Sequence, residues 1–205
     1  MRGKFVVVEG IDGAGGETQT RLLIKFLEEN GKNVLFVTYP DYSGTIGRII
    51  HGFLHKEFDF PADVQFALYA TDMVKDKQKI FQALAEGRIV VANRYLTTTL
   101  AYQTVTGFPL EKGLQFAKNF ELPAPDLVIY VDIDSETSME RKMGEKNNLD
   151  KFEANKEFLE KVRRQYLQLA RKKIFAKEWK IVNGKKTIDE VAEEIKKIVT
   201  TKLKL

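Results

Sequence analysis

The strongest chemical signal in the sequence is a glycine-rich segment that follows the first apolar run of the chain. The segment reads EGIDGAGGETQ from Glu9 to Gln19 and precedes a helical pattern. Glycine permits positive φ and lets the backbone approach a ligand closely, and the N–H groups of such a turn converge on phosphate oxygens. We therefore predict phosphate contacts for Gly10, Asp12, Gly13, Ala14, Gly15, Gly16, Glu17 and Thr18.

This segment departs from the phosphate-binding pattern G-x-x-x-x-G-K-[ST] at two positions. Gly10 and Gly15 match, whereas Gly16 replaces the lysine and Glu17 replaces the hydroxyl residue. The local charge changes by about −2, and one charge pair about 4 Å apart is worth about 4 kcal/mol at an effective dielectric of about 20. The Glu17 carboxylate is a candidate magnesium ligand that would recover part of this loss. Taken alone, the segment is also compatible with a glycine-rich structural turn.

A second candidate phosphate ligand is Arg94, which follows the apolar run Ile89–Ala92. Ligands of parallel sheets bind beyond the carboxyl ends of the strands, so Arg94 is expected beside the glycine-rich segment. A guanidinium at that place can bind phosphate through two N–H groups at once. A surface salt bridge is the alternative role for Arg94.

The elements that must position these residues are short apolar runs alternating with helical patterns. Runs without polar alternation are typical of strands covered on both faces, and strand–helix alternation predicts an α/β fold with a parallel sheet and right-handed crossovers. The predicted strands are Phe5–Val8, Val34–Val37, Ile89–Ala92, Leu127–Val131 and Trp179–Val182.

The helical patterns are equally regular. We expect one long helix from Ala62 to Glu86, because Pro61 precedes it and Gly87 follows it. Thr187-x-x-Glu190 predicts a capping box at the start of the last helix. The other predicted helices are Arg21–Glu29, Thr45–Leu54 and Phe158–Ala170.

Composition narrows the possible classes of protein. The 205 residues fit one domain, and the 33 basic and 29 acidic residues give a net charge of only +4. So small an excess does not indicate nucleic-acid binding and suits a small polyanion equally well. The chain has no cysteine, which excludes disulfides and thiolate metal sites. No apolar run approaches the roughly 18 residues of a membrane span, and a cytoplasmic location is the expectation.

The segment EGIDGAG-x-x-TQ resembles the phosphate loop of thymidylate kinases, E-G-x-D-G-x-G-K-[ST]-T-Q, and the resemblance runs along nearly the whole chain. It implies a P-loop NTPase-type fold, in which helices flank a parallel five-stranded sheet, with a single domain over residues 1–205 and a short lid at about 141–153. It also implies ATP as phosphate donor with Mg²⁺, thymidine monophosphate (dTMP) as acceptor, and a homodimer.

Later landmarks resemble the acceptor side of that family. Tyr39-Pro40 is similar to its F-P segment, Tyr69 falls on the aromatic residue that stacks on thymine, and Asn93-Arg94-Tyr95 is similar to D-R-[YH]. The resemblance implies substrate contacts for Asp12, Tyr39, Pro40, Tyr69, Met73, Arg94, Tyr95, Tyr102, Gln103 and Phe152.

The donor side is implied in the same way. Catalytic roles fall on Asp12, Arg94 and Arg141, with Lys142, Lys146 and Lys151 as further lid cations. Asn183 lies in the loop expected near adenine, and Asn93 joins Glu17 as a candidate metal ligand.

Several departures from the family coincide with these functional positions. Tyr42 and Met73 stand where substrate-binding arginines are usual, and Asn93 stands for an aspartate. The chain is then an enzyme with a rebuilt site, a catalytically weak relative, or a protein with an engineered loop. A kinase of another nucleotide or nucleoside and a non-catalytic nucleotide-binding module remain alternatives.

Overall fold

The computed structural model describes residues 2–145, 150–153 and 155–203. Within these residues, five strands form one parallel sheet in the order β2-β3-β1-β4-β5. The strands are β1 (Lys4–Glu9), β2 (Val34–Thr38), β3 (Ile89–Asn93), β4 (Leu127–Asp132) and β5 (Trp179–Asn183). The predicted fold class is therefore confirmed, and each predicted strand lies where it was expected.

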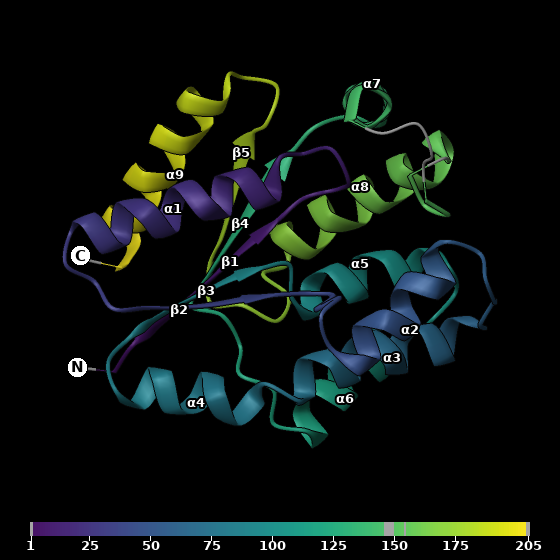
Figure 1. The fold of residues 1–205 in the computed structure, drawn as a ribbon, viewed down its shortest axis with the longest axis horizontal. Coiled ribbons are helices and arrows are strands. Elements are labelled where there is room, and N and C mark those ends of the chain that lie inside the picture. The colour runs from purple at the N-terminus through teal and green to yellow at the C-terminus, as the bar shows by residue number, and fades with distance from the viewer. Residues whose placement is uncertain (1, 146–149, 154, 204–205) are drawn as a thin grey trace.

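Helices cover both faces of the sheet, which explains the apolar strands (Figure 1). On one face α1 (Gly16–Glu29) packs against α9 (Ile188–Leu203), and on the other lie α4 (Lys77–Ala85) and α8 (Lys156–Arg171). Beside α8 lie α5 (Leu96–Val105) and α7 (Ser135–Glu145), and against α5 pack α3 (Ala62–Val74) and α6 (Leu110–Asn119). Finally, α2 (Thr45–Leu54) packs on α3. No helix of the described ranges is long and apolar enough to cross a membrane.

The predicted continuous helix Ala62–Glu86 is wrong, because α3 ends at Val74 and α4 begins at Lys77. Neither glycine nor proline marks the break. The two halves pack on different partners, α3 on α2 and α5 but α4 on β3, so the chain must change direction between them. At the break Lys75 Nζ donates to the Asp72 carbonyl oxygen at 3.0 Å. This bond satisfies one of the carbonyl groups that lack a helical partner at the end of α3.

The start of the last helix follows its sequence signal. The Thr187 N–H donates to Glu190 Oε2 at 3.0 Å, and the Glu190 N–H donates to Thr187 Oγ1 at 3.3 Å. These reciprocal bonds satisfy two of the N–H groups left over at a helix N-terminus. The capping box is thus confirmed.

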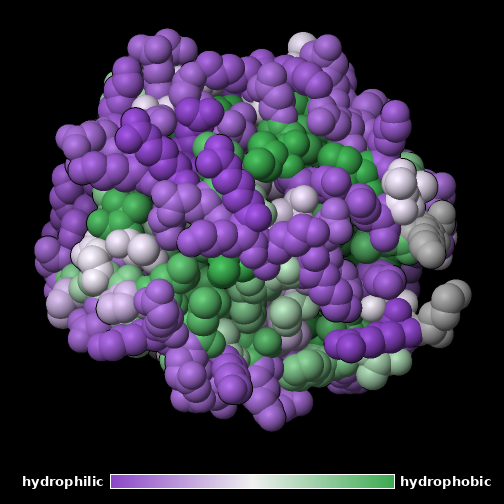
Figure 2. Space-filling model, turned by 180° about the vertical axis from the view of Figure 1, so that it is seen from behind, coloured by the Kyte–Doolittle hydropathy of each residue, from purple (hydrophilic) through white to green (hydrophobic). Residues whose placement is uncertain are grey.

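Large apolar side chains are exposed at several places on the surface. Figure 2 shows a hydrophobic area in the lower half of the rear face, at the height of α3, α4 and α6 in Figure 1. Large apolar side chains that remain exposed include Ile49 on α2, Val64 on α3 and Phe120 just after α6.

Candidate active site

The glycine-rich segment forms a loop between β1 and α1, from Gly10 to Gly15, which is called the phosphate loop below. Gly13 and Gly15 have φ of 75° and 84°, and a Cβ on Gly13 would lie 2.7 Å from the Ser138 carbonyl oxygen. Only glycine fits there. The Ala14 N–H is used inside the loop, donating to the Ile11 carbonyl at 3.1 Å, whereas the N–H groups of Gly13 and Gly15 have no acceptor within the described part of the chain. The loop therefore offers open donors to an anion.

The two predicted metal ligands have separate partners. The Glu17 carboxylate pairs with Arg21 one turn along α1 at 2.6 Å and is 64% exposed. Asn93 Nδ2 donates to Thr38 Oγ1 at 3.2 Å. A Cβ on Gly16 would lie 3.3 Å from Asn93 Oδ1, so Asn93 faces the position where the lysine is missing.

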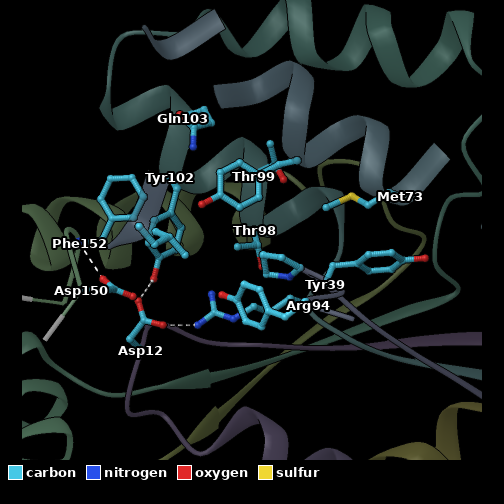
Figure 3. A pocket seen from close by; sticks show the side chains of 14 residues that line it. Asp12, Tyr39, Met73, Arg94, Thr98, Thr99, Tyr102, Gln103, Asp150 and Phe152 are labelled. Carbon is cyan, nitrogen blue, oxygen red and sulfur yellow. Dashed lines mark hydrogen bonds and ion pairs between the residues drawn. The ribbon is translucent and has the colours of Figure 1, made fainter. Parts of the chain in front are cut away.

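Arg94 directly follows the last residue of β3 and contacts the loop through Asp12. Its Nη2 donates to Asp12 Oδ1 at 2.6 Å, and the Tyr102 hydroxyl donates to Asp12 Oδ2 at 2.8 Å (Figure 3). Burial acts to lower the pKa of Arg94, but Asp12 and the surrounding oxygens raise it well above its ordinary value. The guanidinium is therefore a permanent cation with further N–H groups available to a phosphate.

Glu9 is a buried residue that sequence analysis did not assign to the site. It is 0% exposed at the end of β1, and its carboxylate accepts bonds from the Tyr95 N–H at 3.1 Å, the Thr97 hydroxyl at 2.5 Å and the Tyr166 hydroxyl at 2.8 Å. Thr98 donates to it as well. Burial raises the pKa of Glu9 despite these bonds. Because its donors come from the start of α5 and from α8, Glu9 fixes the backbone that follows Arg94.

Most of the predicted acceptor residues line one pocket beside Asp12. The pocket is lined by Asp12, Tyr39, Pro40, Tyr69, Met73, Arg94, Tyr102, Gln103 and Phe152 of that prediction. It is also lined by residues not assigned to the substrate from sequence, namely Tyr42, Leu54, Thr98, Thr99 and Asp150. Helices α3 and α5 supply the facing walls, as Figure 3 shows.

The walls of this pocket combine aromatic and apolar side chains with the polar side chains of Asp12, Arg94, Thr98, Thr99, Gln103 and Asp150. Met73 is 1% exposed and gives an apolar surface at the position where the family usually has an arginine. Burial raises the pKa of Tyr69 well above its ordinary value, so its ring stays an uncharged phenol at neutral pH. The Thr106 hydroxyl lies 2.9 Å from the Gln103 carbonyl oxygen and 3.0 Å from Gln103 Oε1, and it donates its one hydrogen to either. Figure 3 shows the Gln103 amide directed toward the pocket. Such a slot suits a planar, weakly polar base.

Tyr95 is the one predicted acceptor residue that the structure does not place on the pocket wall. Its side chain is 0% exposed and packs edge-on against Phe5, with ring centroids 5.1 Å apart. The chain leaves β3 with Arg94 at φ 63°, and the next side chain turns into the core. Tyr95 contributes to the site indirectly, because its N–H holds Glu9 and its ring packs against Tyr39, with centroids 5.9 Å apart.

Arg141, expected on a mobile lid, stands on helix α7 and contacts the phosphate loop directly. It donates to the Gly13 carbonyl at 3.2 Å and to the Gly184 carbonyl at 2.9 Å. It therefore joins the phosphate loop to the turn after β5. Asn183, the last residue of β5, precedes that turn, and its Oδ1 accepts the Lys185 N–H at 3.0 Å.

The remaining lid residues divide between two places. Lys142 lines a second and larger cavity, which runs along the glycine-rich loop and is also lined by Asn93 and Arg94. Lys151 instead pairs with Asp59 at 2.5 Å and lies 4.5 Å from the centre of the Phe53 ring, on the side of α2. Lys146 lies outside the described residues. The cationic groups expected on one lid are thus not all directed to the phosphates.

Lys75 supports the wall formed by Tyr39 and Asp41. Its ammonium lies 2.9 Å from Asp72 Oδ1, 2.9 Å from Asp76 Oδ2 and 3.3 Å from Asp41 Oδ2. It also lies 5.2 Å from the centre of the Tyr39 ring. The Asp72 side chain is only 1% exposed, so this lysine neutralises a buried charge.

We expect Lys75→Met to lower the free energy of unfolding by about 2–3 kcal/mol, because a buried carboxylate loses its cation. Urea denaturation at neutral pH measures this. Lys25→Met is the matched control, since Lys25 pairs with Glu29 at 3.8 Å while 72% exposed and should change stability by less than about 0.5 kcal/mol. Equal losses of stability in the two variants would contradict the view that Lys75 neutralises a buried carboxylate.

Comparisons with known proteins agree with this geometry. The thymidylate kinase family model matches residues 8–195. The chain is 36% identical to the probable thymidylate kinase of Pyrococcus abyssi, covering 99% of this chain and 98% of the relative. It is 32% identical to the thymidylate kinase of Caldanaerobacter subterraneus, covering 100% and 98%. The fold matches that of the thymidylate kinase from Candida albicans with a TM-score of 0.77, at 24% identity over 98% of this chain and 92% of that one. The chain therefore belongs to the thymidylate kinase family.

Proposed function

We propose that the protein transfers the γ-phosphate of ATP to dTMP and forms thymidine diphosphate. The observation that carries this proposal is the position of an aromatic pocket directly beside a phosphate loop, with Arg94 and Asp12 between them. Phosphoryl transfer depends on positioning two nucleotides and stabilising charge, which such an arrangement provides.

Each part of the site has a role in this proposal. The open N–H groups of the phosphate loop hold the donor phosphates, and Arg94 holds the acceptor phosphate. Tyr69 stacks on the thymine ring, and the Gln103 amide donates to a carbonyl oxygen of the base. Arg141 and Asn183 border the donor side, because Arg141 links the phosphate loop to the turn after β5.

Magnesium fits the residues of the larger cavity. Mg²⁺ usually takes one or two protein oxygens and completes its shell with water and substrate phosphates. Consistent with that mode, the described residues contain no group of three or more histidine, cysteine, aspartate or glutamate side chains placed to hold a metal. Asn93 Oδ1 and the Glu17 carboxylate are the groups that would hold the ion, which would neutralise charge on the transferred phosphate.

We also propose a homodimer. Helices α2 and α3 form an apolar groove on the surface, lined by Ile46, Asp63, Val64, Ala67, Leu68 and Thr71. The neighbouring Ile49 is 38% exposed. A groove of this kind favours burial against a second copy, which sedimentation velocity would measure. A cytoplasmic location stays a prediction from the sequence.

We expect the purified protein to form ADP from ATP in the presence of dTMP and Mg²⁺, and to bind dTMP more tightly than cytidine, uridine or guanosine monophosphate. A coupled ADP assay and calorimetric titrations test the two parts. Equal affinity for all four monophosphates would assign the pocket to another acceptor. Binding of ATP and dTMP without turnover would instead favour the non-catalytic module, which the family match does not favour.

A further inference from the structure

The charges around the larger cavity are unfavourable for polyphosphates. This cavity of about 880 Å³ runs along the phosphate loop and reaches α2. Two fixed cations, Arg94 and Lys142, line it among the described residues. The carboxylates that line it are more numerous, namely Asp12, Glu17, Asp41, Asp150 and Glu153. Arg21 and Lys75, which do not line the cavity, pair with Glu17 and Asp41, but within the described residues the carboxylates still outnumber the cations. A cavity for phosphates therefore needs further positive charge.

Both histidines of the chain lie on the wall of this cavity. His51 and His55 are one turn apart at the carbonyl end of α2, and their rings stack with centroids 3.9 Å apart. His55 Nδ1 lies 2.9 Å from the His51 carbonyl oxygen. Because a carbonyl can only accept, this nitrogen carries hydrogen, so protonation adds the charge and a new donor at Nε2.

Tyr42 connects this pair to the acceptor pocket. Its ring packs edge-on against His51, with centroids 5.6 Å apart, and it lines both the pocket and the larger cavity. By the resemblance to the family, Tyr42 occupies the position where an arginine is usual. The histidines thus lie next to the place where that cation is missing.

We propose that His51 and His55 form a proton-dependent phosphate-binding element, which strengthens the binding of nucleotide phosphates as the pH falls. Histidine is the side chain whose charge ordinarily changes between about pH 5 and 8. The carbonyl end of a helix also stabilises positive charge. The inference rests on the proposed function for the identity of the nucleotide, but not for the presence of a phosphate.

Other charged groups near the pair have fixed partners. Asp41 is bound by Ser43 and Lys75, and Arg48 on α2 donates to the Ser43 carbonyl at 3.0 Å. Lys142 and Glu153, from α7 and from the turn before α8, lie 3.6 Å apart. Asp150 adds a carboxylate from the same turn, and burial raises its pKa. The two histidines are the only groups on this cavity wall, among the described residues, whose type ordinarily titrates near neutral pH.

The test compares the wild type with the double variant His51→Gln/His55→Gln by calorimetry at about pH 6 and about pH 8. The ligands are dTMP, inorganic tripolyphosphate and thymidine. Phosphate groups titrate near pH 6 themselves, so the measured quantity is the ratio of dissociation constants, variant over wild type, at each pH. Protonation of the free ligand cancels in that ratio.

We expect a ratio of about threefold or more at about pH 6 and close to one at about pH 8 for at least one phosphate ligand. A response to dTMP alone assigns the histidines to the acceptor phosphate, and a response to tripolyphosphate assigns them to the donor side. Thymidine should show a ratio of one throughout. Arg48→Gln is the matched control, because loss of a permanent charge on the same helix gives the same ratio at both pH values.

A ratio that is independent of pH for both phosphate ligands would overturn the proposal. Its failure is distinguishable from failure of the proposed function. If dTMP does not bind but tripolyphosphate shows the pH-dependent ratio, the acceptor assignment is wrong and the histidine element stands. If dTMP is phosphorylated but neither ratio depends on pH, the proposed function stands and the histidine element is wrong.

Discussion

The double variant Gly16→Lys/Glu17→Thr is expected to phosphorylate dTMP at least about 10²-fold faster than the wild type. The change restores a cation and removes a carboxylate beside the donor phosphates. One such charge pair is worth about 4 kcal/mol at a separation of about 4 Å, which corresponds to roughly 10³-fold in rate, and solvent reduces this figure. The measurement is kcat/KM for dTMP at saturating ATP and Mg²⁺.

The structure has room for both side chains. Within the described ranges, an added Cβ at Gly16 meets only Asn93 Oδ1, at 3.3 Å, so the end of one side chain must shift slightly. Glu17 gives up an exposed pair with Arg21, which contributes little to stability. A lysine in the first helical turn is also favoured over glycine by up to about 1 kcal/mol. The backbone of the loop is therefore expected to persist.

The control for this experiment is Glu28→Thr, an exposed exchange later on α1 that removes the same charge and should leave kcat/KM unchanged. Glu17→Thr alone should give a smaller gain than the double variant. A fall in rate for the double variant would show that Glu17 works as a metal ligand in a rebuilt site. If neither form is active, Asn93→Asp is the next exchange, because Asn93 faces the restored lysine.

Arg94→Ala is expected to weaken dTMP binding by about 1.5–3 kcal/mol, roughly 10- to 150-fold in the dissociation constant. Tyr42 and Met73 carry no charge, so Arg94 holds more of the acceptor phosphate than it would with arginines at those positions. Removing it also leaves Asp12 without the cation that lies 2.6 Å away, and the freed carboxylate repels the phosphate. Calorimetry with dTMP measures the loss.

Two controls separate binding from folding in that variant. Loss of Arg94 leaves the Asp12 carboxylate 2.6 Å away without its cation, so the unfolding transition of the variant must be recorded. Arg94→Lys keeps the charge but loses the second N–H contact, and should show an intermediate affinity. Thymidine, which lacks the phosphate, should bind both variants as it binds the wild type. An unchanged dissociation constant for dTMP in a folded Arg94→Ala protein would remove Arg94 from the site.

The sequence by itself determined the fold, and its resemblance to the family pointed to most of the residues that line the pocket beside the glycine-rich loop. Apolar runs buried on both faces, such as Phe5–Val8, and glycines at Gly13 and Gly15 are local requirements, so their signals are visible along the chain. The parallel sheet predicted from strand–helix alternation then places the loop and Arg94 beyond the carboxyl ends of their strands. Patterns of this kind need no knowledge of distant contacts.

Only the tertiary structure decided which way individual side chains turn. Tyr95 enters the core although Arg94 beside it enters the site, and Glu9 is held by groups from α5 and α8. The break between α3 and α4 has no local signal, since it follows from packing on different partners and from the contacts of Lys75. The stacked histidines likewise acquire their proposed role only because α2 forms a wall of the larger cavity. Contacts between residues far apart in sequence set these orientations, and local propensity does not encode them.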